Sequence, residues 1–120
     1  MTSMKGWLLN MSEATNNIVE ETVEVDFDTL MSDITNILDE IQTGTTNNFI
    51  IKECGIIDVK LDEIRVRKYN NIDTIESICH SINKDISKMR GVLNQPEEMY
   101  TKYDVLESMV QQIPSVYQPL

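Results

Sequence analysis

Few residues in this 120-residue chain could carry acid–base, nucleophilic or metal chemistry. Its one histidine, His80, directly follows Cys79. Neighbours on a helix point to different sides, so a seam cysteine beside a surface histidine is a simpler interpretation than a metal or nucleophile site. The paired acids Asp62-Glu63 have no predicted cleft around them, and the four glycines form no phosphate-binding loop. We expect no catalytic site, no metal, no cofactor and no enzymatic activity.

Charge is strongly negative and unevenly distributed. The formal net charge is −10, and residues 1–44 carry nine acids against the single base Lys5, a net of −8. Nucleic-acid binding and adhesion to anionic lipid both need clustered bases, so we expect neither. The only positive cluster is Arg65–Lys68. It could contact the acidic first third of this chain or of a neighbouring chain, or it could be a solvated patch.

Cysteine use and hydropathy indicate a cytoplasmic protein. On one continuous helix, Cys54 and Cys79 would lie about 37 Å apart, too far for a disulfide, so buried reduced thiols are expected. The apolar run Trp7–Leu9 is too short for a signal peptide. No stretch approaches the length of a membrane span, so we expect no direct membrane insertion.

The chain's main pattern is an apolar stripe that predicts one long helix over 49–95. Its second half repeats at steps of three and four, the seam of a helix that pairs lengthwise with another helix. The seam residues are Ile72, Ile75, Cys79, Ile82, Ile86, Met89 and Leu93, preceded on the same face by Ile57, Leu61 and Ile64. Leu61 and Ile72 are eleven residues apart, so the heptad pattern stutters between them. This helix would be roughly 70 Å long.

Two shorter helices are expected on either side of it. A second heptad stripe predicts a helix over 22–42, with its seam at Val23, Phe27, Leu30, Ile34, Ile37 and Ile41. Gly44 and the polar residues after it predict a short connection, hence an antiparallel hairpin. Pro96 followed by two acids predicts a third helix over 97–112, and residues 114–120 form a tail. Residues 1–21 are expected to be a mobile arm, in which Trp7 is a docking anchor or simply one aromatic residue.

These elements predict an all-α fold: an extended helical hairpin or coiled coil with one long central helix and a short C-terminal helix, non-globular, in a single region over 22–113. Most of the long stripe would then project beyond the hairpin uncovered. We therefore expect the seam residues to form a partner interface, and helix formation to be coupled to binding.

Several segments resemble the cappuccino family, the fourth subunit of the biogenesis of lysosome-related organelles complex 1. Lys60–Arg65, Tyr69 and Ile72–Glu76 are similar to the family's Lys-x-x-Glu-Met-Arg, Tyr and Ile-Asp-x-Leu-Glu, and Ile113–Tyr117 is similar to its closing Val-Pro-Ser-Leu-Phe. The acidic first helix, from Val23, also resembles the family's opening helix. The matches span about residues 23–117 in order. The chain departs from the pattern by one extra residue before Tyr69 and a shorter first connection.

The resemblance implies a non-enzymatic coiled-coil subunit of a hetero-oligomeric rod that sorts endosomal cargo towards lysosome-related organelles. Its partners would be small coiled-coil subunits like pallidin, dysbindin and snapin, and it would associate peripherally with endosomes. Patterning leaves other classes open: a small coiled-coil subunit of a tether, kinetochore or lysosome-positioning complex, a homo-oligomeric coiled coil, or a small enzyme or regulator that uses the Trp7 arm.

Overall fold

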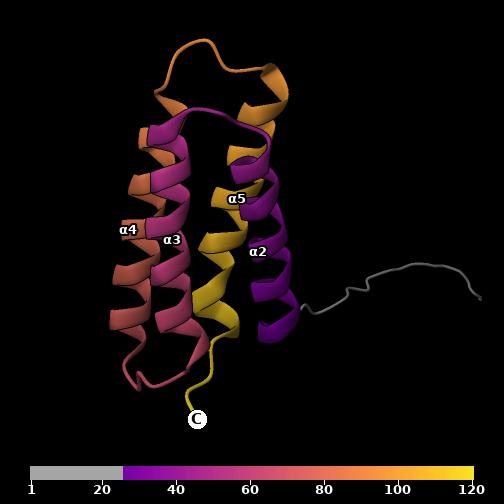
Figure 1. The fold of residues 1–120 in the computed structure, drawn as a ribbon. Helices are drawn as coiled ribbons and strands as arrows, with labels where there is room; N and C mark the ends of the chain where they lie inside the picture. Colours follow the sequence, from indigo (N-terminus) through magenta and orange to yellow (C-terminus); the bar gives the residue numbers. More distant parts are fainter. Residues whose placement is uncertain (1–25) are drawn as a thin grey trace, which may run out of the picture.

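The computed structural model describes residues 26–120, which form four helices. These are α2 (Phe27–Thr43), α3 (Asn48–Arg65), α4 (Ile72–Arg90) and α5 (Glu97–Val116). They alternate in direction, and each packs against two neighbours, so that α2 and α4 each contact both α3 and α5 (Figure 1). No strand occurs between residues 26 and 120, so the all-α prediction is confirmed there. The expected arm over 1–21 and Val23 lie outside the described residues.

Short polar residues at the helix starts explain where three of the helices begin. The side chains of Asp26, Asn47 and Asn71 each accept a backbone amide from the first turn of the helix that follows, at 2.7, 3.1 and 2.8 Å. Helix α5 follows Pro96. At the end of α2, the amide of Gly44 donates to a carbonyl of the last turn at 2.9 Å.

The predicted single helix over 49–95 is wrong, because the chain folds back within it. Residues 66–71 separate α3 from α4, and Asn71 caps a new helix. Within this connection Arg67 has a φ of 56°, a left-handed conformation that costs a non-glycine residue about 1–2 kcal/mol. Reversal lets the stripe of both halves pack against α2 and α5. This gain in apolar burial outweighs the local strain.

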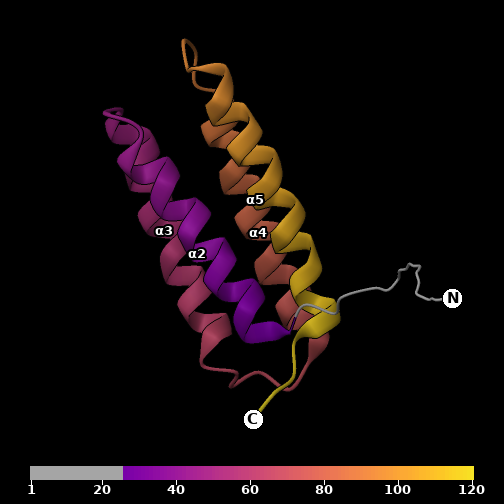
Figure 2. The ribbon, with the colours of Figure 1, turned by 90° about the vertical axis from the view of Figure 1, so that its right-hand side faces the viewer.

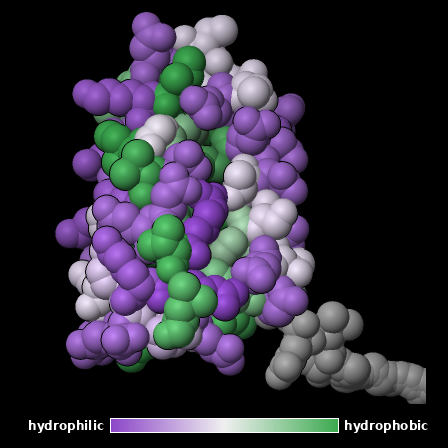
Figure 3. All heavy atoms as spheres, turned by 60° about the horizontal axis from the view of Figure 1, so that its bottom comes forward, coloured by the Kyte–Doolittle hydropathy of each residue, from purple (hydrophilic) through white to green (hydrophobic). Residues whose placement is uncertain are grey.

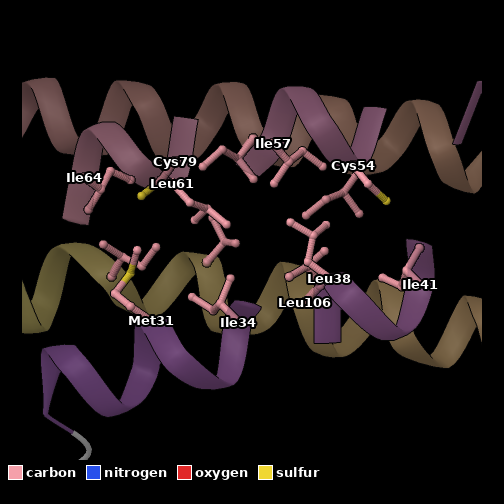
Figure 4. Packing of buried hydrophobic residues seen from close by; sticks show 14 of the residues in the cluster. Met31, Ile34, Leu38, Ile41, Cys54, Ile57, Leu61, Ile64, Cys79 and Leu106 are labelled. Carbon is pink, nitrogen blue, oxygen red and sulfur yellow. The ribbon is translucent and has the colours of Figure 1, made fainter. Parts of the chain in front are cut away.

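The expected extended, non-globular shape is wrong for the same reason. The four helices enclose one core, in which residues of the two predicted seams face each other across the bundle (Figure 4). The other expected bounds also shift. The first helix begins at Phe27 within the described residues, and the last continues through Pro114 to Val116.

The two ends of the bundle differ. At the end that holds connection 66–71 and the C-terminus, called here the tail end, the α2–α3 and α4–α5 hairpins lie close together (Figure 2). Towards the other end the hairpins diverge. That end carries the turns 44–47 and 91–96 and is called here the loop end.

Candidate interaction surfaces

A buried ion pair joins α3 to α4. Nζ of Lys60 lies 2.5 Å from Oδ2 of Asp85 and donates to Oγ of Ser81 at 2.7 Å. Asp85 is only 4% exposed, whereas the Lys60 side chain is 27% exposed. A carboxylate buried in this way requires its partner at a fixed position. The pair therefore fixes the register of α3 along α4.

The basic run Arg65–Lys68 contacts the acidic first third of the chain. The Arg65 guanidinium donates to the hydroxyl of Thr35 on α2. The Arg67 guanidinium lies 2.8 Å from the Asp28 carboxylate and 4.5 Å from the Phe27 ring centroid. Of the two interpretations left open by the sequence, the intramolecular contact is the one present for these two arginines.

The cysteines and the histidine do not come together. Burial raises the pKa of Cys54 to about 11 and that of Cys79 to about 12, so both thiols are protonated at neutral pH. The two cysteines lie at opposite ends of the core (Figure 4), and His80 is on the exposed side of α4. Between residues 26 and 120, no group of three or more histidine, cysteine or acidic side chains could hold a metal ion.

At the tail end, the last residues of the chain contact connection 66–71. The Tyr117 hydroxyl donates to the backbone carbonyl of Tyr69 at 2.7 Å, and the Leu120 amide donates to the Arg67 carbonyl at 3.2 Å. The Tyr117 ring meets the Phe27 ring edge-on, with centroids 5.6 Å apart. The two hydrogen bonds from Tyr117 and Leu120, called here the tail contacts, hold the connection in its folded-back shape.

Apolar side chains also reach the surface at the tail end. Val66 is 54% exposed, Ile72 42% and Leu120 92%. Seen towards this end, hydrophobic atoms form a broken band among hydrophilic ones (Figure 3). The band is interrupted by polar atoms, so it is not one continuous apolar face.

At the loop end, a cleft of about 350 Å³ separates the two turns. None of its lining residues carries a charge, although the chain as a whole has a net charge of −10. The apolar lining comes from both hairpins, and Leu93 is 81% exposed. The cleft is lined by Gly44, Thr45, Thr46, Asn47, Ile50, Val92, Leu93, Asn94, Gln95, Pro96 and Met99.

Gln95 holds the turn that presents Leu93. Its Nε2 donates to the carbonyls of Met89 and Val92, both at 2.8 Å, and its Oε1 accepts from the hydroxyl of Tyr103. These bonds satisfy carbonyls left open where α4 ends. Leu93 is therefore an exposed apolar side chain on a well-supported turn.

The structure places most predicted seam residues inside the bundle. Fully or nearly fully buried are Ile57, Leu61, Ile64, Ile75, Cys79, Ile82, Ile86 and Met89, together with Phe27, Leu30, Ile34 and Ile41. Ile37 is partly buried, and among the seam residues that the structure describes only Ile72 and Leu93 are largely at the surface. The expectation that the long stripe stays uncovered is wrong, because α2 and α5 cover it. Whether these residues also contact partner subunits stays a prediction.

Sequence reasoning missed two polar residues that fix the folded-back shape, Asp85 and Tyr117. One signal was readable. Asn71, followed by Asp73 in the next turn, is an N-cap pattern that marks a helix start in the middle of the predicted long helix. The other residues act through contacts between distant segments, which spacing along the chain does not reveal.

Comparison of the chain with protein-family models, with curated proteins and with solved structures finds no match. Across residues 26–120, no helix is long and apolar enough to cross a membrane.

Proposed function

We propose that the chain is a non-enzymatic helical subunit of a hetero-oligomeric complex for the biogenesis of lysosome-related organelles, acting in endosomal cargo sorting and vesicle trafficking. The loop-end cleft is the structural observation that supports an assembly role. The ordered resemblance of residues 23–117 to the cappuccino family supports this particular complex. The proposed partners are small coiled-coil subunits like pallidin, dysbindin and snapin.

The cleft has the composition of a protein-binding site. Its apolar residues Ile50, Val92 and Met99 lie among polar groups of the two turns. An apolar centre within a polar rim is the usual anatomy of a protein interface. Leu93 at the rim is the proposed anchor, because an exposed apolar side chain on a supported turn loses little conformational entropy on binding.

The absence of charge in the cleft favours an apolar helical partner. A strongly acidic chain repels other acidic proteins over most of its surface. An uncharged site is where a partner of the same sign can approach at the least electrostatic cost. The proposed role needs no nucleic acid, membrane insertion or small-molecule substrate. We propose a cytoplasmic location, with peripheral association to endosomes through the assembled complex.

The test is co-expression of the chain with pallidin-, dysbindin- and snapin-like subunits, followed by measurement of the mass of the purified complex. We expect a stoichiometric complex, and we expect Leu93→Asp to weaken it. Leu120→Asp is the matched control, because it makes the same charge change at an exposed leucine of the tail end. Equal assembly of Leu93→Asp and the unaltered chain would remove the cleft from the proposal.

The family itself is tested by mass spectrometry of proteins that co-purify with the tagged chain from its native cells. Recovery of the named subunits at similar abundance is expected. A different coherent set of small helical proteins would retain the assembly role and discard the family, in favour of a tether, kinetochore or lysosome-positioning complex. Recovery of the chain alone would discard the hetero-oligomer.

A further inference from the structure

Connection 66–71 is held in a bent shape that its residues do not require. It contains neither glycine nor proline, so no residue in it forbids a helix. In the folded-back chain Arg67 takes a φ of 56°. A straight helix through 66–71 would remove that strained conformation and add backbone hydrogen bonds.

The apolar faces of α3 and α4 would be aligned if the helix continued through this connection. Ile64 in α3 and Ile75 in α4, both fully buried, are eleven residues apart, which is three helical turns to within about 20°. In a straight helix over 48–90, about 65 Å long, the buried faces of α3 and α4 would therefore lie on one side. Helices joined by a connection of arbitrary length would not share a face in this way.

The register between α3 and α4 suits two copies of such a straight helix. Cys54 lies 3.8 Å from Met89 through their sulfur atoms, and Lys60 contacts both Ser81 and Asp85. All three pairs are centred within residues 70–73. Two straight helices that run antiparallel about a two-fold axis at this point make the same pairs, now between chains, in both halves.

We propose that the free chain forms a dimer by exchanging hairpins with a second copy. Residues 66–71 straighten, and the α2–α3 hairpin of each copy packs on the α4–α5 hairpin of the other. The partner in this dimer is a second copy of the chain, because the core and the Lys60–Asp85 pair then re-form between chains without any new interface. The proposal concerns the free chain and does not depend on the proposed function.

The tail contacts oppose this exchange. The hydrogen bonds from Tyr117 to the Tyr69 carbonyl and from Leu120 to the Arg67 carbonyl exist only while the connection is bent. In a straight helix both carbonyls bond within the helix instead. The monomer is favoured by these contacts and by mass action at low concentration, and the dimer is favoured by relief of the strain at Arg67.

The first test introduces a proline at a position where it destabilises the straight helix but is tolerated in the folded-back chain. Ile72 is the first residue of α4, after Asn71 in an extended conformation, and proline is well tolerated at such a position. In the middle of a continuous helix, proline is strongly unfavourable. We expect Ile72→Pro to lower the dimerisation constant at least about a hundredfold, whereas Ile72→Ala, which removes the same side chain, dimerises like the unaltered chain.

Asn48→Pro is the control for proline itself. Asn48 is exposed, begins α3 and follows the extended Asn47, and the proposed dimer leaves that turn unchanged. Light scattering over a concentration series gives the dimer fraction, and circular dichroism verifies that each variant is folded. A dimer that Ile72→Pro leaves intact would overturn the proposal, as would a chain that stays monomeric throughout the series even when the tail contacts are weakened.

The second test weakens the tail contacts. Tyr117→Phe removes the hydrogen bond to the Tyr69 carbonyl but keeps the ring against Phe27. We expect it to raise the dimerisation constant about fivefold for each chain. Tyr100→Phe is the matched control, because the Tyr100 hydroxyl bonds to the Val92 carbonyl in the loop-end turn, which exchange leaves unchanged. An equal effect of both variants would overturn the role of the tail contacts.

The third test distinguishes exchange from simple association of folded monomers. Nζ atoms of Lys60 and Lys88 lie 2.5 and 3.8 Å from the same Asp85 carboxylate, so an amine cross-linker can join them. Isotopically heavy and light chains are unfolded together and refolded, and the dimer is isolated and cross-linked. Mixed heavy–light Lys60–Lys88 products are expected. Products that are only all-heavy or all-light would show that each monomer stays folded back, and would overturn the exchange.

Discussion

The carboxylate of Asp85 on α4 and the ammonium of Lys60 on α3 form the most buried ion pair among the described residues, with 2.5 Å between Oδ2 and Nζ. Four other ion pairs join different segments of the chain: Arg67 with Asp28, Arg90 with both Asp104 and Glu107, and Lys102 with Glu40. In three of these the side chain of the acid is more than half exposed, and that of Glu107 is 32% exposed. Only the Lys60–Asp85 pair is expected to contribute strongly to stability, because exposed pairs are screened by solvent.

Asp85→Ala is therefore expected to destabilise the chain by about 1–3 kcal/mol, since it leaves the partly buried Lys60 without its carboxylate. Urea unfolding at neutral pH measures the change. Asp104→Ala, which breaks an exposed pair with Arg90, is the control and should cost less than about 1 kcal/mol. Equal losses in the two variants would contradict the role assigned to Asp85.

Alkaline pH should destabilise the chain through its two thiols. In the unfolded chain they ionise near their ordinary pKa of 9, whereas in the folded chain burial raises the pKa of Cys54 to about 11 and that of Cys79 to about 12. The unfolded state therefore holds fewer protons above pH 9. The thiols contribute no pH dependence below pH 9, and above it each lowers the free energy of unfolding by up to about 1.4 kcal/mol per pH unit.

Urea unfolding from pH 8 to pH 11 tests this slope. The matched variant carries Cys54→Ala and Cys79→Ala, and it should lose stability less steeply above pH 9 even though it starts from a lower value. Parallel curves for the two proteins would show that the thiols are not the source of the pH dependence.

Gln95→Ala should loosen the loop-end turn. It removes the partner of the buried Tyr103 hydroxyl and two bonds to backbone carbonyls. A loss of about 1–3 kcal/mol is expected in thermal unfolding. Gln111→Ala, at an exposed position of α5, is the control. Adding Tyr103→Phe should recover part of the loss, because no buried hydroxyl is then left unpaired; full additivity of the two changes would contradict the hydrogen bond.

Truncation of a buried leucine or isoleucine of the predicted seams should destabilise the chain much more than truncation of an exposed one. Ile34→Ala empties a fully buried position and should cost about 2–5 kcal/mol, whereas Leu93→Ala at the exposed turn should stay within about 0.5 kcal/mol. Ile82→Asp should unfold the chain itself, because Ile82 is fully buried, and so cannot report on partner binding alone. Denaturant unfolding of the three variants measures these losses of stability. An Ile82→Asp chain that stays folded would contradict the burial of Ile82.

Periodicity along the chain was sufficient to predict the helical class and the apolar helix faces, but not that most residues on these faces form the core of this chain itself. The steps of three and four that place Ile34 and Leu61 on apolar faces are local and survive in either a straight or a folded-back chain. Gly44 and Pro96 also marked real helix boundaries. The candidate cleft was not predictable, because its lining joins residues 44–50 to residues 92–99, and only packing of the two hairpins brings these segments together.

Residue types and their spacing are enough to establish which residues are apolar, on which helical faces they lie, and that those faces must be covered. Which segments cover these faces depends on how distant parts of the chain pack in three dimensions. Residues 66–71 contain no breaker, so bent and straight conformations differ by a small local free energy, and the contacts of distant residues select between them. Tyr117 and Leu120 supply those contacts, and long-range contacts of this kind leave no pattern in residue spacing.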